Sequence, residues 1–170
     1  MSMIGNLARI PETTRQRLHQ DPSRIPQFLY PQAVEDESLP PDDVMDLDKA
    51  WHGLHFLFTG SDWSDDFPEG FLVACGKPVG DVDVGYGPAR SFSPSEVEEI
   101  AAFLEAQKEG TLRQRLDPKA MAELEIYPGI WAEDTNLDEE WEYLLDGFRR
   151  MKEFVREAVS KKMALLVYLN

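Results

Sequence analysis

Two of the chain's 3 histidines, His52 and His55, lie in the stretch DKAWHGLHFLFTG at 48–60. Imidazole titrates near neutral pH, so either side chain could act as a general base or as a metal ligand. On a helix, the spacing i, i+4, i+7 places Asp48 and both histidines on one side. This pattern allows a metal site formed by Asp48, His52 and His55. It equally allows a hydrolase or transferase in which Asp48 orients one histidine as the base.

Other sequence features give this chemistry little support. Zinc sites use three or four protein ligands, and the sequence contains neither an HExxH motif nor a cysteine–histidine cluster. No GxSxG motif marks a serine nucleophile. The single cysteine, Cys75, lies in the apolar run FLVAC and is expected to be buried and unreactive. We therefore expect no metal and no cofactor, and the histidines are also compatible with polar positions at the edge of the core.

Aromatic residues surround the histidines and recur in two stretches rich in glycine and proline, GYGPAR at 85–90 and IYPGIW at 126–131. Loops with such demanding backbone paths often carry function. Tyrosine and tryptophan suit ligand pockets, and arginine can bind an anion with two hydrogen bonds or pair with a carboxylate. One hypothesis is a single cleft, and the alternative is that the aromatic rings fill the core separately. The cleft would be lined by Trp51, His52, His55, Tyr86, Arg90, Tyr127 and Trp131.

Regular elements must position these residues. Asp46 is a suitable cap for a helix over 47–58, which Gly60 would end. A capping box, SPSE at 93–96, starts another helix, which Gly110 would end. Strands are expected at 1–10, 71–75, 82–86 and 163–169. Further helices are expected at 11–19, 22–29 and 111–116, after Asp117 and, as the longest element, at 137–160.

The order of strand, helices, strands, helices and strand predicts an α+β fold in a single domain over residues 1–170, with a small mixed sheet covered by helices. The helix at 137–160 should pack on the sheet. The apolar run at 163–169 should form a buried strand in its interior. Residues 31–46, which include the acidic part from Glu35 to Asp46, are predicted to be a mobile loop. Residues 61–69, SDWSDDFPE, form a second acidic loop that carries Trp63.

The composition limits the partners. The chain has 32 acidic and 17 basic residues and a net charge of -15, which repels nucleic acids and anionic membranes. The charge favours a basic protein or a cation as partner, and the alternative is that it serves only to keep the protein soluble. No apolar run is long enough to span a membrane, and no export signal is evident. With a single, buried cysteine, the chain is expected to be cytoplasmic.

Five segments together resemble the YfbM-like family of bacterial proteins of unknown function. They are MIGNL at 3–7, LDKAWHGLHFLFTG at 47–60, VGYGPAR at 84–90, EIYPGIW at 125–131 and the apolar C-terminal strand. The resemblance spans nearly the whole chain and implies a single α+β domain. It implies no reaction and no catalytic residue.

These observations favour a non-enzymatic binding protein. It would hold a small ligand in the aromatic and histidine cleft, or a basic partner protein on its acidic surface, as an inhibitor or immunity-type protein does. The alternative is a hydrolase or transferase that uses His52 or His55 as the general base or as a metal ligand.

Overall fold

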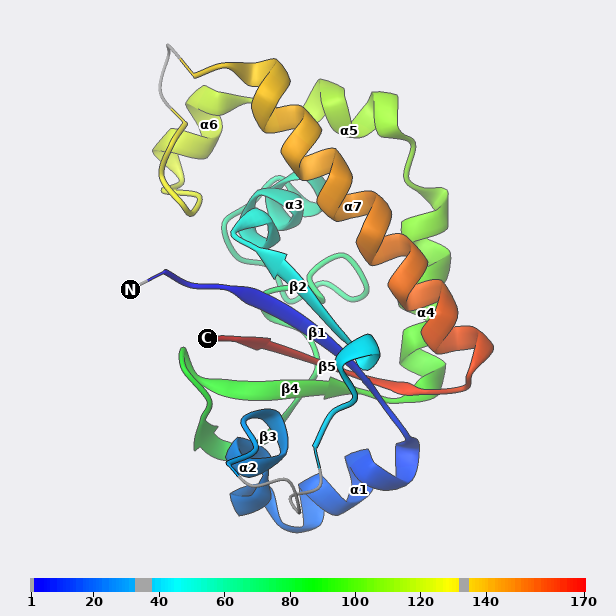
Figure 1. Cartoon of the computed structure of the whole chain (residues 1–170). Helices are drawn as coiled ribbons and strands as arrows, with labels where there is room; N and C mark the ends of the chain where they lie inside the picture. Colours follow the sequence, from blue (N-terminus) through cyan, green and yellow to red (C-terminus); the bar gives the residue numbers. More distant parts are fainter. Residues whose placement is uncertain (1, 33–37, 132–134) are drawn as a thin grey trace.

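The computed structural model describes residues 2–32, 38–131 and 135–170. At its centre lies a five-stranded sheet with strand order β2-β1-β5-β4-β3 (Figure 1). The strands are β1 (Gly5–Ile10), β2 (Val44–Asp48), β3 (Lys77–Asp83), β4 (Pro88–Phe92) and β5 (Ala164–Leu169). The four pairings in this sheet are antiparallel. The α+β class is therefore confirmed, whereas the prediction of a mixed sheet is wrong.

The last strand, β5, is the middle strand, as its uninterrupted apolar sequence predicted. It pairs with β1 on one side and β4 on the other. Leu165 and Val167 face the larger of two hydrophobic clusters, whereas Leu166 and Tyr168 face the smaller one. Because both faces of the strand are covered, neither set of alternating side chains needs to be polar.

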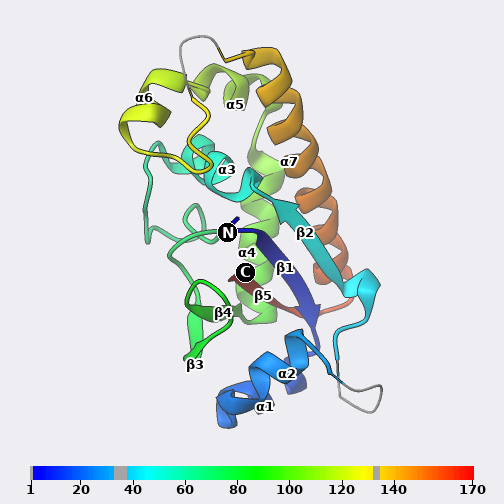
Figure 2. The same ribbon diagram turned by 60° about the vertical axis from the view of Figure 1, so that its left-hand side comes forward.

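Helices cover both faces of the sheet (Figures 1 and 2). Over the larger cluster lie α3 (Ala50–Thr59), α4 (Pro94–Ala106) and α7 (Leu137–Ser160). Over the smaller cluster lie α1 (Glu12–Gln20) and α2 (Ile25–Leu29). The short helices α5 (Glu109–Arg115) and α6 (Pro118–Glu123) lie beyond the end of the sheet, near α3 and the start of α7. Among the described residues, no helix is both long enough and apolar enough to cross a membrane.

The long helix α7 holds α3 in place through two close approaches. Its start is capped by Asn136, whose side chain accepts from the amide of Glu139. A Cβ atom on Gly53 of α3 would lie 2.8 Å from a methyl group of Leu144, and one on Gly147 of α7 would lie 3.3 Å from the Cβ of Ala50. The two glycines therefore allow the helix that carries the histidines to pack tightly against α7.

Residues 44–48 form a strand, where the sequence had predicted a loop up to residue 46 and a helix from residue 47. Along β2, Met45 and Leu47 are buried while Asp46 and Asp48 are exposed, which is the period of a strand. The Asp46 side chain accepts from the amide of Asp48, which has φ 49. This turn ends the strand, and α3 begins only at Ala50. The part of the predicted loop at 33–37, like Met1 of the predicted first strand, lies outside the described residues.

Three other expected boundaries differ from the structure. Residues 71–75 form hydrogen-bonded turns, with the amides of Ala74 and Cys75 both donating to the carbonyl of Gly70. Their burial comes from packing and not from a sheet. Residues 77–83 and 88–92 form a hairpin in place of the single strand predicted at 82–86. Helix α4 ends at Ala106, and Gly110 lies inside α5.

Candidate functional site

Three of the predicted site residues form a stack of rings at one end of the sheet. The Trp51 ring stacks on His52, with centroids 4.7 Å apart, and on Tyr127, with centroids 5.9 Å apart. The stack also holds the chain just before β1, because Trp51 Nε1 donates to the carbonyl of Met3 at 3.2 Å and the Met3 amide donates to the Tyr127 hydroxyl at 3.0 Å. A Cβ atom on Gly5 would lie 2.7 Å from that of Trp51, so this position requires glycine.

Both ring nitrogens of His52 bind backbone groups. Its Nδ1 accepts from the amide of Tyr127 at 2.9 Å, so its Nε2 must carry the proton that it donates to the carbonyl of Asp62, also at 2.9 Å. This arrangement requires a neutral imidazole, and burial accordingly lowers the pKa of His52. His52 thus connects two loops that lie 75 and 10 residues from it in sequence.

His55 lies deeper than His52. It is 0% exposed, and neither ring nitrogen has a hydrogen-bond partner among the described residues. Its ring centroid is 6.3 Å from that of His52. Burial, with a smaller contribution from the nearby charge of Arg90, lowers the pKa of His55 to about 4. The side chain is therefore neutral at neutral pH.

Arg90 binds three backbone carbonyls of one turn. Its Nη1 donates to the carbonyls of Phe71, at 3.1 Å, and Cys75, and its Nη2 donates to the carbonyl of Leu72 at 2.7 Å. Burial lowers the pKa of Arg90 to about 10. The guanidinium therefore holds the turn at 71–75. Among the described residues Arg90 has no ion pair with a carboxylate, so the prediction of such a pair is wrong. Cys75 is buried as predicted, and burial raises the pKa of its thiol.

Two predicted residues lie apart from the stack. Trp131 is buried, donates from Nε1 to the carbonyl of Ile126 at 2.8 Å and packs beside Gly53. Tyr86 lies in the β3–β4 turn with its side chain 41% exposed, and its amide donates to the carbonyl of Leu169. The structure thus brings Trp51, His52 and Tyr127 into contact and leaves Tyr86 at the surface.

The alternative metal triad is not assembled. Asp48 ends a strand instead of beginning a helix, and its Oδ2 accepts from the Tyr143 hydroxyl at 3.0 Å. The helical spacing that linked it to His52 and His55 therefore does not exist. Within the described ranges, no group of three or more histidine, cysteine, aspartate or glutamate side chains could hold a metal ion.

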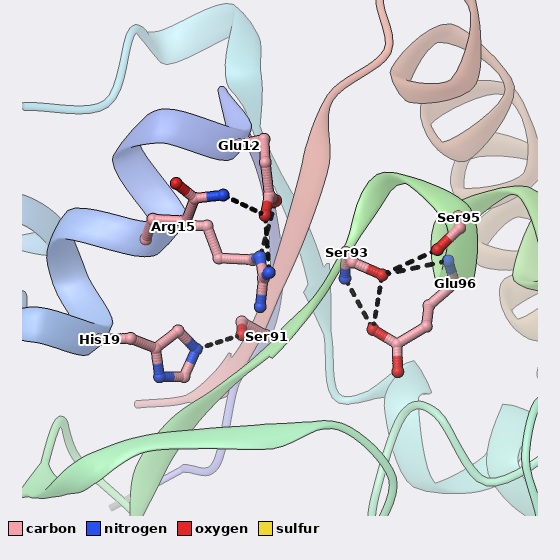
Figure 3. Close-up of polar contacts among 8 residues, drawn as sticks. Glu12, Arg15, His19, Ser91, Ser93, Ser95 and Glu96 are labelled. Atoms are coloured by element: carbon pink, nitrogen blue, oxygen red, sulfur yellow. Dashed lines mark hydrogen bonds and ion pairs between the residues drawn. The ribbon is translucent and has the colours of Figure 1, made fainter.

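The remaining histidine forms a contact that the sequence did not predict. His19, at the end of α1, lies with Nε2 2.7 Å from the hydroxyl of Ser91 in β4, beside the ion pair of Glu12 and Arg15 (Figure 3). A histidine next to a serine is the arrangement of an activated nucleophile. Here, however, Ser91 is 1% exposed, so the contact serves to attach α1 to the sheet.

The acidic loop after α3 is the most exposed aromatic region that the structure describes. We define the Trp63 loop as residues Ser61–Gly70. Its Trp63 is 57% exposed, while Asp62, Asp65 and Asp66 are exposed beside it. Trp63 was not among the candidate residues inferred from the sequence. The available signal was a tryptophan surrounded by acids, without apolar residues at helical or strand spacing.

Comparison with known proteins places the whole chain in one family. A family model described as "Domain of unknown function (DUF1877)" matches residues 1–168. The chain belongs to this family. The crystal structure of YfbM from Escherichia coli, itself a protein of unknown function, is similar to the DUF1877 chain with a TM-score of 0.77. The match covers 98% of this chain and 99% of that one at 21% identity.

At that identity the likeness shows the fold alone, and it confirms the YfbM-like resemblance. No curated protein matches the chain.

Proposed function

We propose that this DUF1877 protein is a non-enzymatic binding protein for a basic partner protein. The observation that carries the proposal is that His52, the strongest candidate for a general base, uses both ring nitrogens to hold backbone groups. A general base needs a free lone pair within reach of the substrate. His55, the other candidate base, is fully buried with a pKa of about 4. Each group that the sequence marked for chemistry therefore has a structural role or lies out of reach.

The charge distribution supports a basic partner. Many basic side chains are already paired within the chain: Arg15 binds Glu12, Arg149 binds Glu109, and Arg156 binds both Glu105 and Glu153. With 32 acidic and 17 basic residues, the chain keeps an excess of 15 carboxylates. Such a surface attracts a positively charged protein over long distances and speeds its association, as in inhibitor or immunity-type complexes.

The test is capture of partners by the immobilised protein from an extract of the cells that produce it, at low and at high salt. Captured proteins are then purified and titrated individually. The proposal expects a partner with a basic isoelectric point whose Kd rises steeply with ionic strength, because salt screens the attraction between exposed charges. A purified partner that binds equally well at both salt concentrations would contradict it.

The small-ligand version stays a second proposal because of His55. A buried neutral imidazole offers one donor and one acceptor, and neither has a partner in the described part of the chain. A small polar molecule bound beside the His55 ring would satisfy both. Its test is a thermal-shift screen of the wild-type protein and His55→Phe. A compound that raises the Tm of both proteins equally would exclude a role for His55.

A further inference from the structure

Trp63 lies beside three carboxylates that have no ion pair with a basic side chain in the described part of the chain. Asp62, Asp65 and Asp66 are exposed, and none of them pairs with a basic side chain within the described ranges. Some acidic residues elsewhere, such as Glu105 and Glu109, bind an arginine or lysine of their own chain. An exposed indole beside unpaired carboxylates presents the two features that attract a cationic side chain.

Backbone contacts within the Trp63 loop hold it in a conformation that leaves Trp63 exposed. The hydroxyl of Ser61 donates to the carbonyl of Trp63 at 2.8 Å, and the amide of Gly70 donates to the carbonyl of Asp66 at 2.7 Å. A Cβ atom on Gly70 would lie 2.1 Å from the carbonyl oxygen of Ser64, so the two arms of the loop touch at a position where only glycine fits. The loop is therefore compact, and its side chains project from a defined backbone.

Contacts with the rest of the domain fix the Trp63 loop from both sides. At its start, His52 donates to the carbonyl of Asp62. Just after its end, Arg90 binds the carbonyls of the turn at 71–75. Near its middle, the ring of Phe67 stacks on the buried Phe92 with centroids 6.1 Å apart. A surface that is already ordered loses little conformational entropy when a partner binds, so more of the contact energy remains as affinity.

We propose that the Trp63 loop is the surface that receives the basic partner. In the complex, the indole of Trp63 packs against the aliphatic stem and the charged end of a partner arginine or lysine, while Asp62, Asp65 and Asp66 lie around the positive charge. This inference rests on the proposed function and names its site. Exposed tryptophan beside a polar rim is the arrangement in which a few side chains provide most of an interface's affinity.

The test uses a fluorescein-labelled short peptide of alternating arginine and serine as the probe, with fluorescence anisotropy as the readout at low salt. The variants are Trp63→Ala and the double variant Asp65→Asn/Asp66→Asn. The matched control is Glu98→Gln/Glu99→Gln, which removes the same two charges from an exposed stretch of α4 where neither glutamate has an ion pair with a described residue. Circular dichroism checks that each variant is folded.

We expect Trp63→Ala to weaken binding of the peptide about tenfold. The loop double variant should weaken it about fivefold, and the α4 control less than about twofold. The wild-type protein should bind a peptide of alternating glutamate and serine at least about a hundredfold more weakly than the arginine peptide. Titration by the intrinsic tryptophan signal provides a second readout, because Trp63 is far more exposed than Trp51 or Trp131.

The experiment distinguishes failure of the proposed site from failure of the proposed function. If the wild-type protein binds the arginine peptide in a salt-sensitive manner but both loop variants retain wild-type affinity, the Trp63 loop is not the site, and the proposed function stands. The same conclusion follows if the α4 control loses as much affinity as the loop variant. If the wild-type protein shows no salt-sensitive preference for the basic peptide over the acidic one, both the site and the proposed function fail.

Discussion

Trp51 and Trp63 lie 12 residues apart in sequence and belong to two regions with opposite properties. Trp51 is 6% exposed, stacks on His52 and Tyr127, and donates a hydrogen bond from its indole nitrogen to the carbonyl of Met3. Trp63 is 57% exposed on a loop whose backbone needs no contact from its ring. His52 joins the regions, since it stacks on Trp51 and binds the carbonyl of Asp62. In this domain, the residues best suited to chemistry hold the structure together, and a surface suited to binding lies on the loop that they support.

The largest expected effect comes from removing the buried tryptophan. Trp51→Ala should lower the free energy of unfolding by about 3–5 kcal/mol, because it deletes a buried ring and leaves a cavity beside Gly5. Urea denaturation followed by circular dichroism measures this loss. Replacing Trp51 with phenylalanine should recover most of it, since a ring then fills the space. A loss below about 1 kcal/mol would show that the stack is not part of the core.

Lowering the pH should reduce the free energy of unfolding, because the buried His55 is neutral in the folded protein. The pKa of His55 is about 4 in the folded protein and about 6.5 in an unfolded chain. The unfolded state therefore binds more protons in this window. Stability is complete above pH 6.5 and falls as the pH drops toward 4, by at most about 3 kcal/mol from this group.

Urea denaturation at a series of pH values measures this dependence, and His55→Phe should flatten it. The remaining slope should come in part from His52, whose pKa is also lowered. An unchanged slope in His55→Phe would mean that His55 titrates normally.

Replacing His52 should show how much stability its two hydrogen bonds to the backbone provide. His52→Ala leaves the amide of Tyr127 and the carbonyl of Asp62 without their partner, at an expected cost of about 1–3 kcal/mol. His52→Gln, whose amide can both donate and accept, should recover part of this stability. Hydrogen exchange should show faster exchange of the Tyr127 amide and of the Trp63 loop in the alanine variant. Unchanged exchange in both segments would contradict the role of His52 as a connector.

The smallest effect on stability is expected at the exposed tryptophan. Trp63→Ala should change the free energy of unfolding by less than about 0.5 kcal/mol, as is usual for surface substitutions without a packing role. Urea denaturation in parallel with Trp51→Ala measures the contrast directly. A loss comparable to that of Trp51→Ala would show that Trp63 packs in the core, and would contradict the contrast between the two tryptophans.

The sequence predicted the elements with strong local signals. The long helix at 137–160, the SPSE capping box before α4 and the uninterrupted apolar run of β5 were all confirmed. The strand β2 was missed because its alternation lasts only five residues and follows a stretch rich in proline and acids. The apolar run at 71–75 predicts a strand wrongly, because a buried turn and a buried strand can share an apolar sequence without periodicity.

The candidate site was predictable only in part, for a physical reason. The helical spacing correctly placed His52 and His55 as neighbours on α3. Their partners could not be inferred, because His52 binds backbone groups of Asp62 and Tyr127, which every residue carries. Arg90 likewise binds backbone carbonyls, those of Phe71, Leu72 and Cys75. Side-chain types therefore gave no indication that these polar atoms were already in use.

Hydrogen exchange of the wild-type protein with and without the basic peptide tests the central claim most directly. We predict that the peptide slows exchange in residues 61–70 and leaves the amides of α3 around Trp51 and His55 unchanged. Slower exchange confined to α3 and the 125–131 loop, with residues 61–70 unaffected, would mean that the buried aromatic and histidine region is the binding site after all.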